Sequence, residues 1–355
     1  AETGDKKRKR DDHNPRVGVA TRSLTARQAR GVLANAFLPN LNDTMASKKD
    51  MWNLGGLNWC RLLTGNNKVG VHRMMCHLLY FEAMSDEASP DLDRAIIFER
   101  IRFEPIDFLN DRALGSSNQS PVGEGIQLHM NVMEHPTRSC SAFVNFANPN
   151  FGYGAFICSC TQEEILESCC PEITVGLLWM GKMADNEVVN VRNVRRFATY
   201  SGYLRSFQCQ GPPPVQQPII IQDVLTMDAC YDDHFSIENI QRDLNKAYFA
   251  FKMHAAAKSN DNDDTSTGKA VPVISTGKWG CGAFEGQAAH KFVQQALAAN
   301  LAGVDLEFSV HRDSEQCDVV LNCLKRCKPT AAQVAAALRT CVNERSFVQD
   351  LGSEL

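Results

Sequence analysis

Residues 145 to 164 read Asn-Phe-Ala-Asn-Pro-Asn-Phe-Gly-Tyr-Gly-Ala-Phe-Ile-Cys-Ser-Cys-Thr-Gln-Glu-Glu. The stretch begins inside an apolar run, Phe143 to Phe146, whose β-branched and aromatic residues predict a buried strand. A loop of small residues follows from Asn148 to Gly154, and two adjacent carboxylates come next, Glu163 and Glu164. Because ligands of α/β sheets bind beyond the strand ends, this order predicts a chemical site here.

The loop and the two carboxylates suit an anionic ligand that carries hydroxyl groups. Gly152 and Gly154 have no Cβ, so backbone N–H groups can come close to an anion. Of two adjacent carboxyls, one can stay protonated as an acid while the other orients a hydroxyl. An ordinary solvated helix that starts at Gln162 is the alternative, since acidic residues suit a first turn.

Two segments of the chain resemble the hallmark motifs of the poly(ADP-ribose) glycohydrolase family. The first contains Phe146-Ala147-Asn148, then Gly-Tyr-Gly at residues 152–154, then Gln162-Glu163-Glu164. That family usually has three glycines at this loop. The second segment runs from Thr276 to Phe284 and reads Thr-Gly-Lys-Trp-Gly-Cys-Gly-Ala-Phe. Both motifs stand in the family's order and far apart along the chain.

The resemblance covers roughly residues 20 to 325. Further segments similar to the family, in order, are Leu24 to Phe37, Met74 to Phe81, Thr199 to Tyr203 and Asp243 to Tyr248. It implies an α/β fold in which a macrodomain-like mixed sheet is flanked by helices, with an added N-terminal helical region.

The hydrophobic pattern alone also predicts an α/β layer architecture. From about residue 120 strands alternate with helices, and several strands are apolar on both faces, as in a sheet that helices cover on both sides. Helices are expected at about 25–37, 70–84 and 287–302, and from Thr330 onward. Strands are expected at 95–98, 141–146, 174–180, 187–191, 218–227, 271–275 and 304–310.

Three regions are expected along the chain. Residues 1–20 are polar and without periodicity, which predicts a disordered basic tail, and Ala1 to Gly4 could be an expression scar. The run from Lys6 to Arg10 matches a nuclear localisation patch or a solvated basic tail. Residues 21–120 should form a helical accessory region, and residues 121–355 a catalytic core packed with it as one unit. Ser259 to Lys269 reads as a flexible surface excursion.

Composition limits the kind of partner. The chain has 355 residues, 44% hydrophobic and 22% charged, with a net charge of −4 and no apolar run long enough for a membrane helix. An anionic ligand must therefore be held by local groups in a pocket. The 14 cysteines lie mostly in or beside apolar runs, which favours a reduced intracellular protein. Cys158, Cys160, Cys169 and Cys170, or Cys323 with Cys327, lack the spacing of a structural zinc site, so no metal is expected.

The resemblance implies hydrolysis of the ribose–ribose O-glycosidic bond of poly(ADP-ribose), with release of ADP-ribose. Such a bond needs an acid for the leaving oxygen and a water molecule. By position in the motif Glu164 is the general acid and base, with a pKa expected to be raised, and Glu163 and Asn148 hold the ribose hydroxyls. The implied substrate-binding residues are Asn145, Gly152, Tyr153, Gly154, Gln162, Tyr200, Thr276, Gly277, Trp279, Gly280, Cys281, Gly282, Ala283 and Phe284.

Departures from the family pattern leave a second interpretation open. Tyr153 replaces the middle glycine, Asn145 replaces an acid, Lys278 an asparagine and Gln287 an aspartate. If Tyr153 points toward the ligand, binding geometry or substrate choice changes; if it points away from the ligand, the loop works as before. The alternative is therefore a catalytically impaired ADP-ribose or poly(ADP-ribose) binding module of the same fold. A nucleic-acid binder that uses the N-terminal tail is a third possibility.

The partners follow from the same resemblance. It implies poly(ADP-ribose) on modified proteins as the partner, no cofactor, no sequence-specific nucleic acid and no membrane. A monomer is expected, acting in the nucleus, with the cytoplasm as a second location, in the DNA damage response.

Overall fold

The computed structural model of the protein describes residues 16–37, 67–110, 114, 120–154, 160–214, 220–261, 270–311 and 315–355. Several expectations fall on other parts of the chain. Outside the described residues lie most of the basic tail with Lys6 to Arg10, Cys158, and residues 262–269 of the expected surface excursion.

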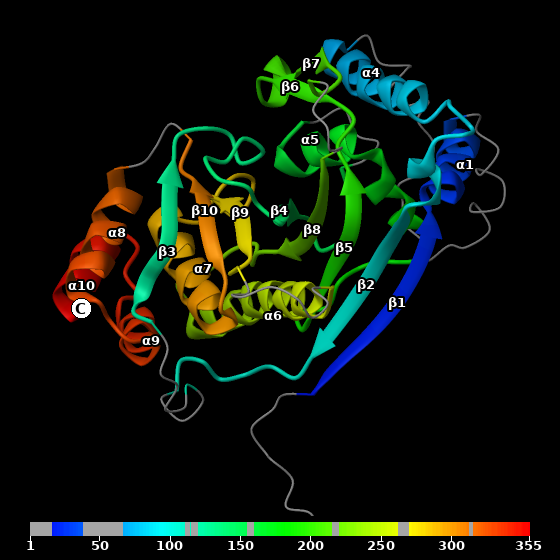
Figure 1. Ribbon diagram of the computed structural model, residues 1–355. Coiled ribbons are helices and arrows are strands. Elements are labelled where there is room, and N and C mark those ends of the chain that lie inside the picture. Colours follow the sequence, from blue (N-terminus) through cyan, green and yellow to red (C-terminus); the bar gives the residue numbers. More distant parts are fainter. Residues whose placement is uncertain are drawn as a thin grey trace, which may run out of the picture.

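Eight strands form one mixed sheet in the order β1-β2-β5-β8-β4-β9-β10-β3 (Figure 1). From β8 to β3 neighbouring strands are parallel, whereas β1, β2 and β5 join antiparallel to one another and to β8. A separate pair of strands forms β6-β7. The strands are β1 Val17–Thr25, β2 Ala95–Phe103, β3 Val122–His129, β4 Ala142–Ala147, β5 Glu187–Arg195, β6 Thr199–Ser201, β7 Gln208–Gly211, β8 Ile221–Asp228, β9 Val273–Gly277 and β10 Asp305–Ser309.

Helices cover both faces of the large sheet. Successive side chains of a strand point to opposite faces, so Val224 joins one hydrophobic core and Leu225 the other. The core with Leu225 lies against α6 (Ile237–Asp261), α7 (Ala288–Ala302), α8 (Glu315–Cys327), α9 (Ala331–Thr340) and α10 (Phe347–Glu354). The core with Val224 lies against α1 (Ala26–Phe37), α4 (Lys68–Ala83), α5 (Gln162–Cys169) and the 3₁₀-helix η2 (Pro171–Leu178). The predicted α/β sheet with two covered faces is confirmed.

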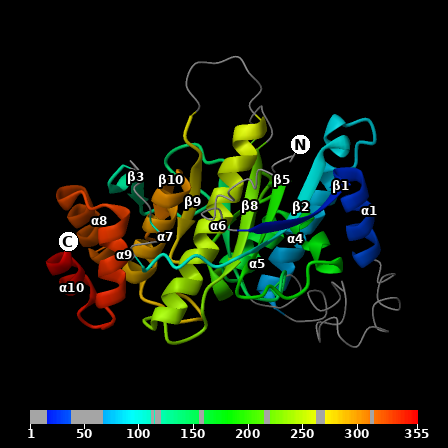
Figure 2. The same ribbon diagram turned by 90° about the horizontal axis from the view of Figure 1, so that it is seen from below.

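The two views show how the helices are grouped. The long helix α6 packs beside α7, and α8, α9 and α10 gather at the edge of the molecule next to β3 (Figures 1 and 2). Two short 3₁₀-helices complete the described elements, η1 Pro90–Asp93 and η3 Leu204–Ser206.

Local signals in the sequence place several helix ends correctly. Thr25 N donates to Gln28 Oε1 at 2.9 Å and Gln28 N donates to Thr25 Oγ1 at 3.2 Å, which is the predicted capping box before α1. Thr330 and Gln333 form the same arrangement before α9. The expected helices at 70–84 and 287–302 correspond to α4 and α7.

The strand expected at 174–180 is wrong. This segment is part of η2, which starts at Pro171 and is stabilised by a hydrogen bond of 2.7 Å from Thr174 Oγ1 to the carbonyl of Pro171. A short buried helix is apolar on all sides, so its hydrophobic pattern cannot be told from that of a buried strand.

The N-terminal region is not purely helical. β1 and β2 extend the sheet by two antiparallel strands, paired from Val17 with Phe103 to Thr25 with Ala95. Most side chains of β1 are exposed, so the strand carries no alternation of buried and exposed residues that a sequence pattern could show. Pairing with β2 forms it. β3 was not expected either, because Gly123 and Gly125 interrupt its apolar pattern.

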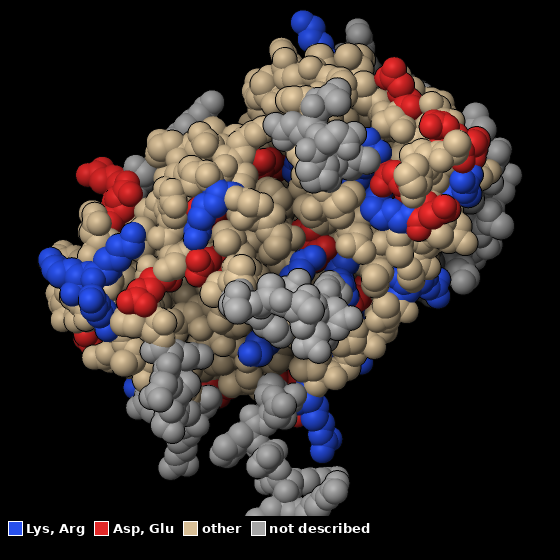
Figure 3. All heavy atoms as spheres, viewed as in Figure 1, with Lys and Arg blue, Asp and Glu red and all other residues tan. Residues whose placement is uncertain are grey.

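Charged residues of both signs are spread over the face in Figure 3, and Lys and Arg gather at its left edge, where α8 lies. Among the described helices, none combines the length and the hydropathy needed to cross a membrane.

Candidate active site

A cavity of about 510 Å³ opens at the carboxyl ends of the parallel strands. Ala147 ends β4, Gly277 ends β9 and Ser309 ends β10, and all three line the cavity, as does Ala229 just after β8. The two segments singled out in the sequence meet here. The cavity is lined by Gln162 and Tyr200 from one side and by Gly277, Trp279, Gly280, Cys281, Gly282, Ala283 and Phe284 from the other.

Helix α5 is fixed to the end of β4 by the residues at its start. Gln162 Oε1 accepts a hydrogen bond from Phe146 N at 2.8 Å, and Gln162 Nε2 donates to the carbonyl of Val144 at 3.2 Å. Glu163 Oε2 accepts from Asn148 N at 3.2 Å. Strand, loop and helix are therefore joined by side chain to backbone bonds, which hold Glu163 beside Asn148.

Glu164 closes a capping box at the first turn of α5. Its Oε2 accepts hydrogen bonds from Thr161 N, at 2.6 Å, and from Thr161 Oγ1. The side chain is buried with only 4% exposed. Neither Glu163 nor Glu164 lines the cavity of the described residues, but their neighbours Thr161, Gln162 and Ile165 do. The glutamate pair thus lies directly behind the cavity wall.

Three buried carboxyl groups share the inner side of α5. Burial, together with the charges of Glu167 and Glu164, raises the pKa of Glu163 well above its usual value. Burial and Glu164 also raise the pKa of Glu167 to about 8, although the nearby guanidinium of Arg73 acts in the opposite direction. The group of carboxyls therefore holds at least one proton at neutral pH.

The glycine loop packs against the rest of the site. A Cβ on Gly154 would stand 2.3 Å from Glu164 Oε1, and a Cβ on Gly152, whose φ is +70°, would stand 2.8 Å from the side chain of Leu177. Tyr153 has no positive φ, is 40% exposed and does not line the cavity of the described residues. Asn145 is buried in β4 and faces Thr226 of β8 in the sheet register. Residues 155–159 lie outside the described part.

The second loop has three successive backbone N–H groups at the cavity wall that have no partner among the described residues. Gly280 has a φ of +75°, and a Cβ there would stand 2.6 Å from that of Ala229. Among the described residues, no acceptor pairs with the N–H groups of Gly282, Ala283 and Phe284. These three successive donors form the kind of concavity in which proteins bind anions.

Other residues of this segment support the loop. Thr276 Oγ1 donates to Gln295 Oε1 at 2.6 Å, and the buried Trp279 donates through Nε1 to the carbonyl of Met227 at 3.0 Å. Lys278 Nζ donates to the carbonyl of His311 at 3.1 Å, and both residues line the cavity.

Glu134 and Tyr203 are among the cavity residues that were missed from sequence. Glu134 Oε2 accepts a hydrogen bond of 2.7 Å from the hydroxyl of Tyr200, and Glu134 Oε1 has no partner among the described residues. Tyr203 lies between the two loops: burial and the charge of Glu164 raise its pKa, and its hydroxyl is 3.9 Å from the position of a Cβ on Gly282. Glu134 could have been suspected as an acid that follows a strand, had β3 been recognised.

The arginines upstream of Tyr200 do not form a solvated face. Arg192 pairs with Glu99, and Arg195 Nη1 lies 2.8 Å from Asp91 Oδ2. Arg196 is 9% exposed and lies over the ring of Phe143.

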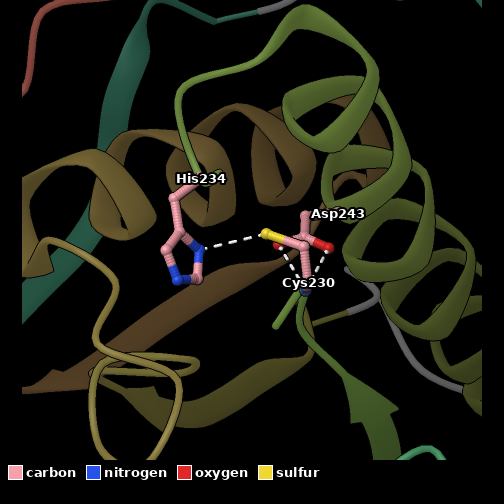
Figure 4. Close-up of side chains that lie close together, drawn as sticks. All are labelled: Cys230, His234 and Asp243. Carbon is pink, nitrogen blue, oxygen red and sulfur yellow. Dashed lines mark hydrogen bonds between the residues drawn. The ribbon is translucent and has the colours of Figure 1, made fainter. Parts of the chain in front are cut away.

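One group of side chains resembles a metal site in its composition. Cys230 Sγ, His234 Nδ1 and the carboxylate of Asp243 lie within 4.8 Å of one another (Figure 4). However, Lys291 Nζ lies 2.5 Å from Asp243 Oδ2 and 3.5 Å from Cys230 Sγ, and Arg242 Nη1 lies 2.7 Å from Asp243 Oδ1. Two cations therefore already neutralise the carboxylate, and burial and Asp243 raise the pKa of Cys230 to about 12, whereas a metal needs the thiolate. The group fits an internal hydrogen-bond network and not a metal site.

Comparison with known families gives one match that covers more than half of the chain. The family described as "Poly (ADP-ribose) glycohydrolase (PARG), Macro domain fold" matches residues 120–318. This range contains the whole cavity, from Val132 to His311.

Individual relatives are more distant. The chain is 25% identical to poly(ADP-ribose) glycohydrolase 1 of Caenorhabditis elegans over 76% of its length, and 25% identical to poly(ADP-ribose) glycohydrolase 2 of that organism over 73%. It spans 35% and 54% of the lengths of these two proteins. A solved structure of poly(ADP-ribose) glycohydrolase from Deinococcus radiodurans in complex with ADP-ribose matches with 17% identity and a TM-score of 0.34, over 57% of this chain and 82% of that one.

Proposed function

Since the chain belongs to the poly(ADP-ribose) glycohydrolase family, with its macrodomain fold, we propose that it hydrolyses the ribose–ribose O-glycosidic bond of poly(ADP-ribose) and releases ADP-ribose. The observation that carries this proposal is the convergence of two distant segments, at Gln162 and at residues 277–284, on one cavity beside a buried pair of glutamates.

The cavity offers separate groups for the parts of an ADP-ribose unit. The N–H groups of Gly282, Ala283 and Phe284 donate to the diphosphate, so binding does not depend on a basic surface. The ring of Tyr200 stacks on the adenine, and Glu134 Oε1 accepts an N–H of the base. The ribose then extends toward α5 and the loop at Asn148.

The buried carboxyls supply the acid and the base. Glu164 donates its proton to the leaving oxygen of the glycosidic bond as the C–O bond breaks and an oxocarbenium-like ribose forms. A water molecule then adds to this carbon and returns a proton to the Glu164 carboxylate. Glu163 and Asn148, held together by their own hydrogen bond, orient the ribose hydroxyls. The raised pKa values of the neighbouring Glu163 and Glu167 carboxyls keep a proton within this buried group at neutral pH, which supports acid catalysis here.

Glu164→Gln is the variant that tests this function. Glutamine keeps the capping box with Thr161, since a side-chain oxygen still faces Thr161 N, but it cannot donate the acid proton. We expect release of ADP-ribose from poly(ADP-ribose) to fall by about 10²–10⁴-fold or more with an unchanged melting temperature. Full turnover in this folded variant would remove Glu164 from the mechanism.

The wild-type protein separates catalysis from binding alone. Release of ADP-ribose by wild-type protein is the expected result, and binding without release would indicate a poly(ADP-ribose) binding module. The hypothesis of a binding module arose from Tyr153 in the glycine loop. The position of Tyr153 does not support it, because the side chain is exposed and does not line the cavity of the described residues.

We also propose a nuclear place of action on poly(ADP-ribose) attached to modified proteins, on the basis of the run from Lys6 to Arg10. Replacing these five residues with alanine in a fluorescent fusion should move the protein out of the nucleus, and unchanged nuclear fluorescence would contradict this.

A further inference from the structure

His234 connects two loops that are far apart in the sequence. It lies between β8 and α6, is 8% exposed, and points one ring nitrogen toward Cys230 (Figure 4). Its Nε2 lies 2.5 Å from the carbonyl oxygen of Phe284, which belongs to the cavity loop, and its Nδ1 lies 3.0 Å from Cys230 Sγ. The imidazole is therefore a direct link between the cavity loop and Cys230, at the beginning of the segment that joins β8 to α6.

The hydrogen-bond partners determine the tautomer of a neutral His234 ring. A carbonyl oxygen can only accept, so Nε2 of His234 must carry the hydrogen that it donates to Phe284. In a neutral ring Nδ1 is then an acceptor, and it accepts from the Cys230 thiol. Lys291 Nζ, 3.5 Å from Cys230 Sγ, donates to the sulfur and leaves its S–H free for the histidine.

The far side of this link is held rigidly. Cys230 N donates to Asp243 of α6 at 3.0 Å, and Asp243 pairs with Lys291 of α7 at 2.5 Å, with all of these side chains buried. Removing one partner of a buried ion pair is costly, so the pair keeps Cys230 in place. His234 therefore has a fixed support against which to hold the loop.

On the other side of His234 lies the cavity loop, residues 280–286, which is tight and packs against the imidazole. Gly286 N donates to the carbonyl of Gly280 at 2.9 Å and closes the loop, and Glu285 has a φ of +59°, which is strained for a residue with a side chain. A Cβ on Gly286 would stand 3.1 Å from His234 Cε1, so the loop lies directly on the imidazole.

We propose that His234 is a positioning residue for the anion-binding loop. By holding the Phe284 carbonyl outward, it fixes the peptide units that aim the N–H groups of Gly282, Ala283 and Phe284 into the cavity. The orientations of the Phe284 carbonyl and of the N–H groups before it are coupled through the backbone torsions. If the carbonyl loses its hydrogen bond to His234, these N–H donors therefore lose their fixed orientation. This inference rests on the proposed binding of ADP-ribose by its diphosphate. It assigns His234 and Cys230 to affinity for the diphosphate and not to the chemical step.

Two variants of His234 separate the hydrogen bond from the bulk of the side chain. His234→Leu removes the donor, and we expect the Kd for ADP-ribose and the KM for poly(ADP-ribose) to rise about tenfold, with kcat unchanged. His234→Gln places an amide N–H where Nε2 stands and should restore wild-type affinity. Adenosine, which has no diphosphate, should bind both variants as it binds the wild type.

The matched control is His254→Leu. His254 is also buried and has a polar neighbour at both nitrogens, Ser141 Oγ at 2.7 Å and Asp223 Oδ2 at 3.2 Å, but it does not line the cavity. It should lower the melting temperature without changing the Kd for ADP-ribose. Cys230→Ala should weaken ADP-ribose binding and Cys230→Ser, which keeps a donor for His234 Nδ1, should not.

An unchanged Kd for ADP-ribose in folded His234→Leu would overturn the inference, as would equal losses in the Leu and Gln variants. If His234→Leu does not fold, the two Cys230 variants decide in the same way. The Kd is measured by calorimetry and needs no turnover. A wild type that binds ADP-ribose but releases none therefore contradicts the proposed function while leaving this inference open to its own test.

Discussion

Gly154 and Glu164 are in direct contact: a Cβ on Gly154 would stand 2.3 Å from Glu164 Oε1 and 2.4 Å from its Cγ. The glycine loop therefore limits the position of the Glu164 side chain and also forms part of the candidate site. Gly154 does not have a positive φ, so the requirement for glycine here is one of space around the carboxyl group and not of backbone conformation.

Gly154→Ala should therefore act on catalysis through Glu164. The added methyl group must push the Glu164 side chain aside. A displacement of about 1 Å in a catalytic group lowers kcat by about 10²-fold. The measurement is kcat for ADP-ribose release together with the melting temperature. Gly31→Ala in α1, where a Cβ meets nothing within 4 Å, is the control: it should leave kcat unchanged and raise the melting temperature slightly, because alanine favours the helix. Wild-type kcat in Gly154→Ala would mean that Glu164 tolerates the shift and does not act on the substrate from this position.

Tyr153→Gly, which restores the usual triple glycine, should have little effect. Because Tyr153 is 40% exposed, has an ordinary φ and stands outside the cavity wall, we expect kcat and KM to change by no more than about twofold, as for a surface substitution. Steady-state kinetics on poly(ADP-ribose) check this. A large gain in activity would show instead that the tyrosine hinders substrate.

The sequence predicted well those parts of the fold that local physics determines. The capping boxes at Thr25 and Thr330 depend on neighbours three residues away, so the residue pattern contains the whole interaction. β4 reads Ala-Phe-Val-Asn-Phe-Ala and is a nearly continuous apolar run, and it is buried on both faces, as β8, β9 and β10 also are. β1 had no such signal, since its strand conformation comes from pairing with β2 and most of its side chains are exposed.

The same division holds for the site. Gln162 was expected to bind substrate, but both ends of its side-chain amide bond to the backbone of β4, and Thr276 is bonded to Gln295. A motif identifies such residues without saying which of them hold the scaffold. Glu134 and His234 were not found from sequence, because the role of each depends on a partner distant along the chain, Tyr200 in one case and Phe284 in the other.

Glu167 should make the protein less stable as pH rises. Its carboxyl has a pKa of about 8 in the folded protein, above its ordinary value of 4.5, so the folded state binds more protons than the unfolded state between these two values. The contribution of Glu167 to the free energy of unfolding is therefore fully present below about pH 4.5 and is lost as the pH rises through about 8. Glu167→Gln removes this loss.

We expect the free energy of unfolding of Glu167→Gln, relative to wild type, to increase by about 2–5 kcal/mol between about pH 5 and pH 9. Urea denaturation at several pH values measures it, and the change with pH matters because a buried amide has a constant cost of its own. Asp350→Asn on the C-terminal helix is the control, and its offset from wild type should not vary over this range. If the free energies of unfolding of Glu167→Gln and wild type change with pH in the same way, the raised pKa of Glu167 is contradicted.

The pair of Tyr200 and Glu134 should determine affinity for the adenine end of the ligand. Tyr200→Ala removes the stacking ring, which contributes about 1–3 kcal/mol to binding of a base, so the Kd for ADP-ribose should rise about 5- to 150-fold. Tyr200→Phe keeps the ring and loses only the 2.7 Å hydrogen bond to Glu134, so we expect a smaller rise of about 2- to 10-fold. Tyr248→Phe, at a partly buried tyrosine packed on Phe108 away from the cavity, is the control.

Because Glu134 is oriented by the Tyr200 hydroxyl, the effects of Tyr200→Phe and Glu134→Gln on the Kd should not be additive. Additive effects would mean that the two side chains contact the ligand independently, and an unchanged Kd in Tyr200→Ala would place the base elsewhere.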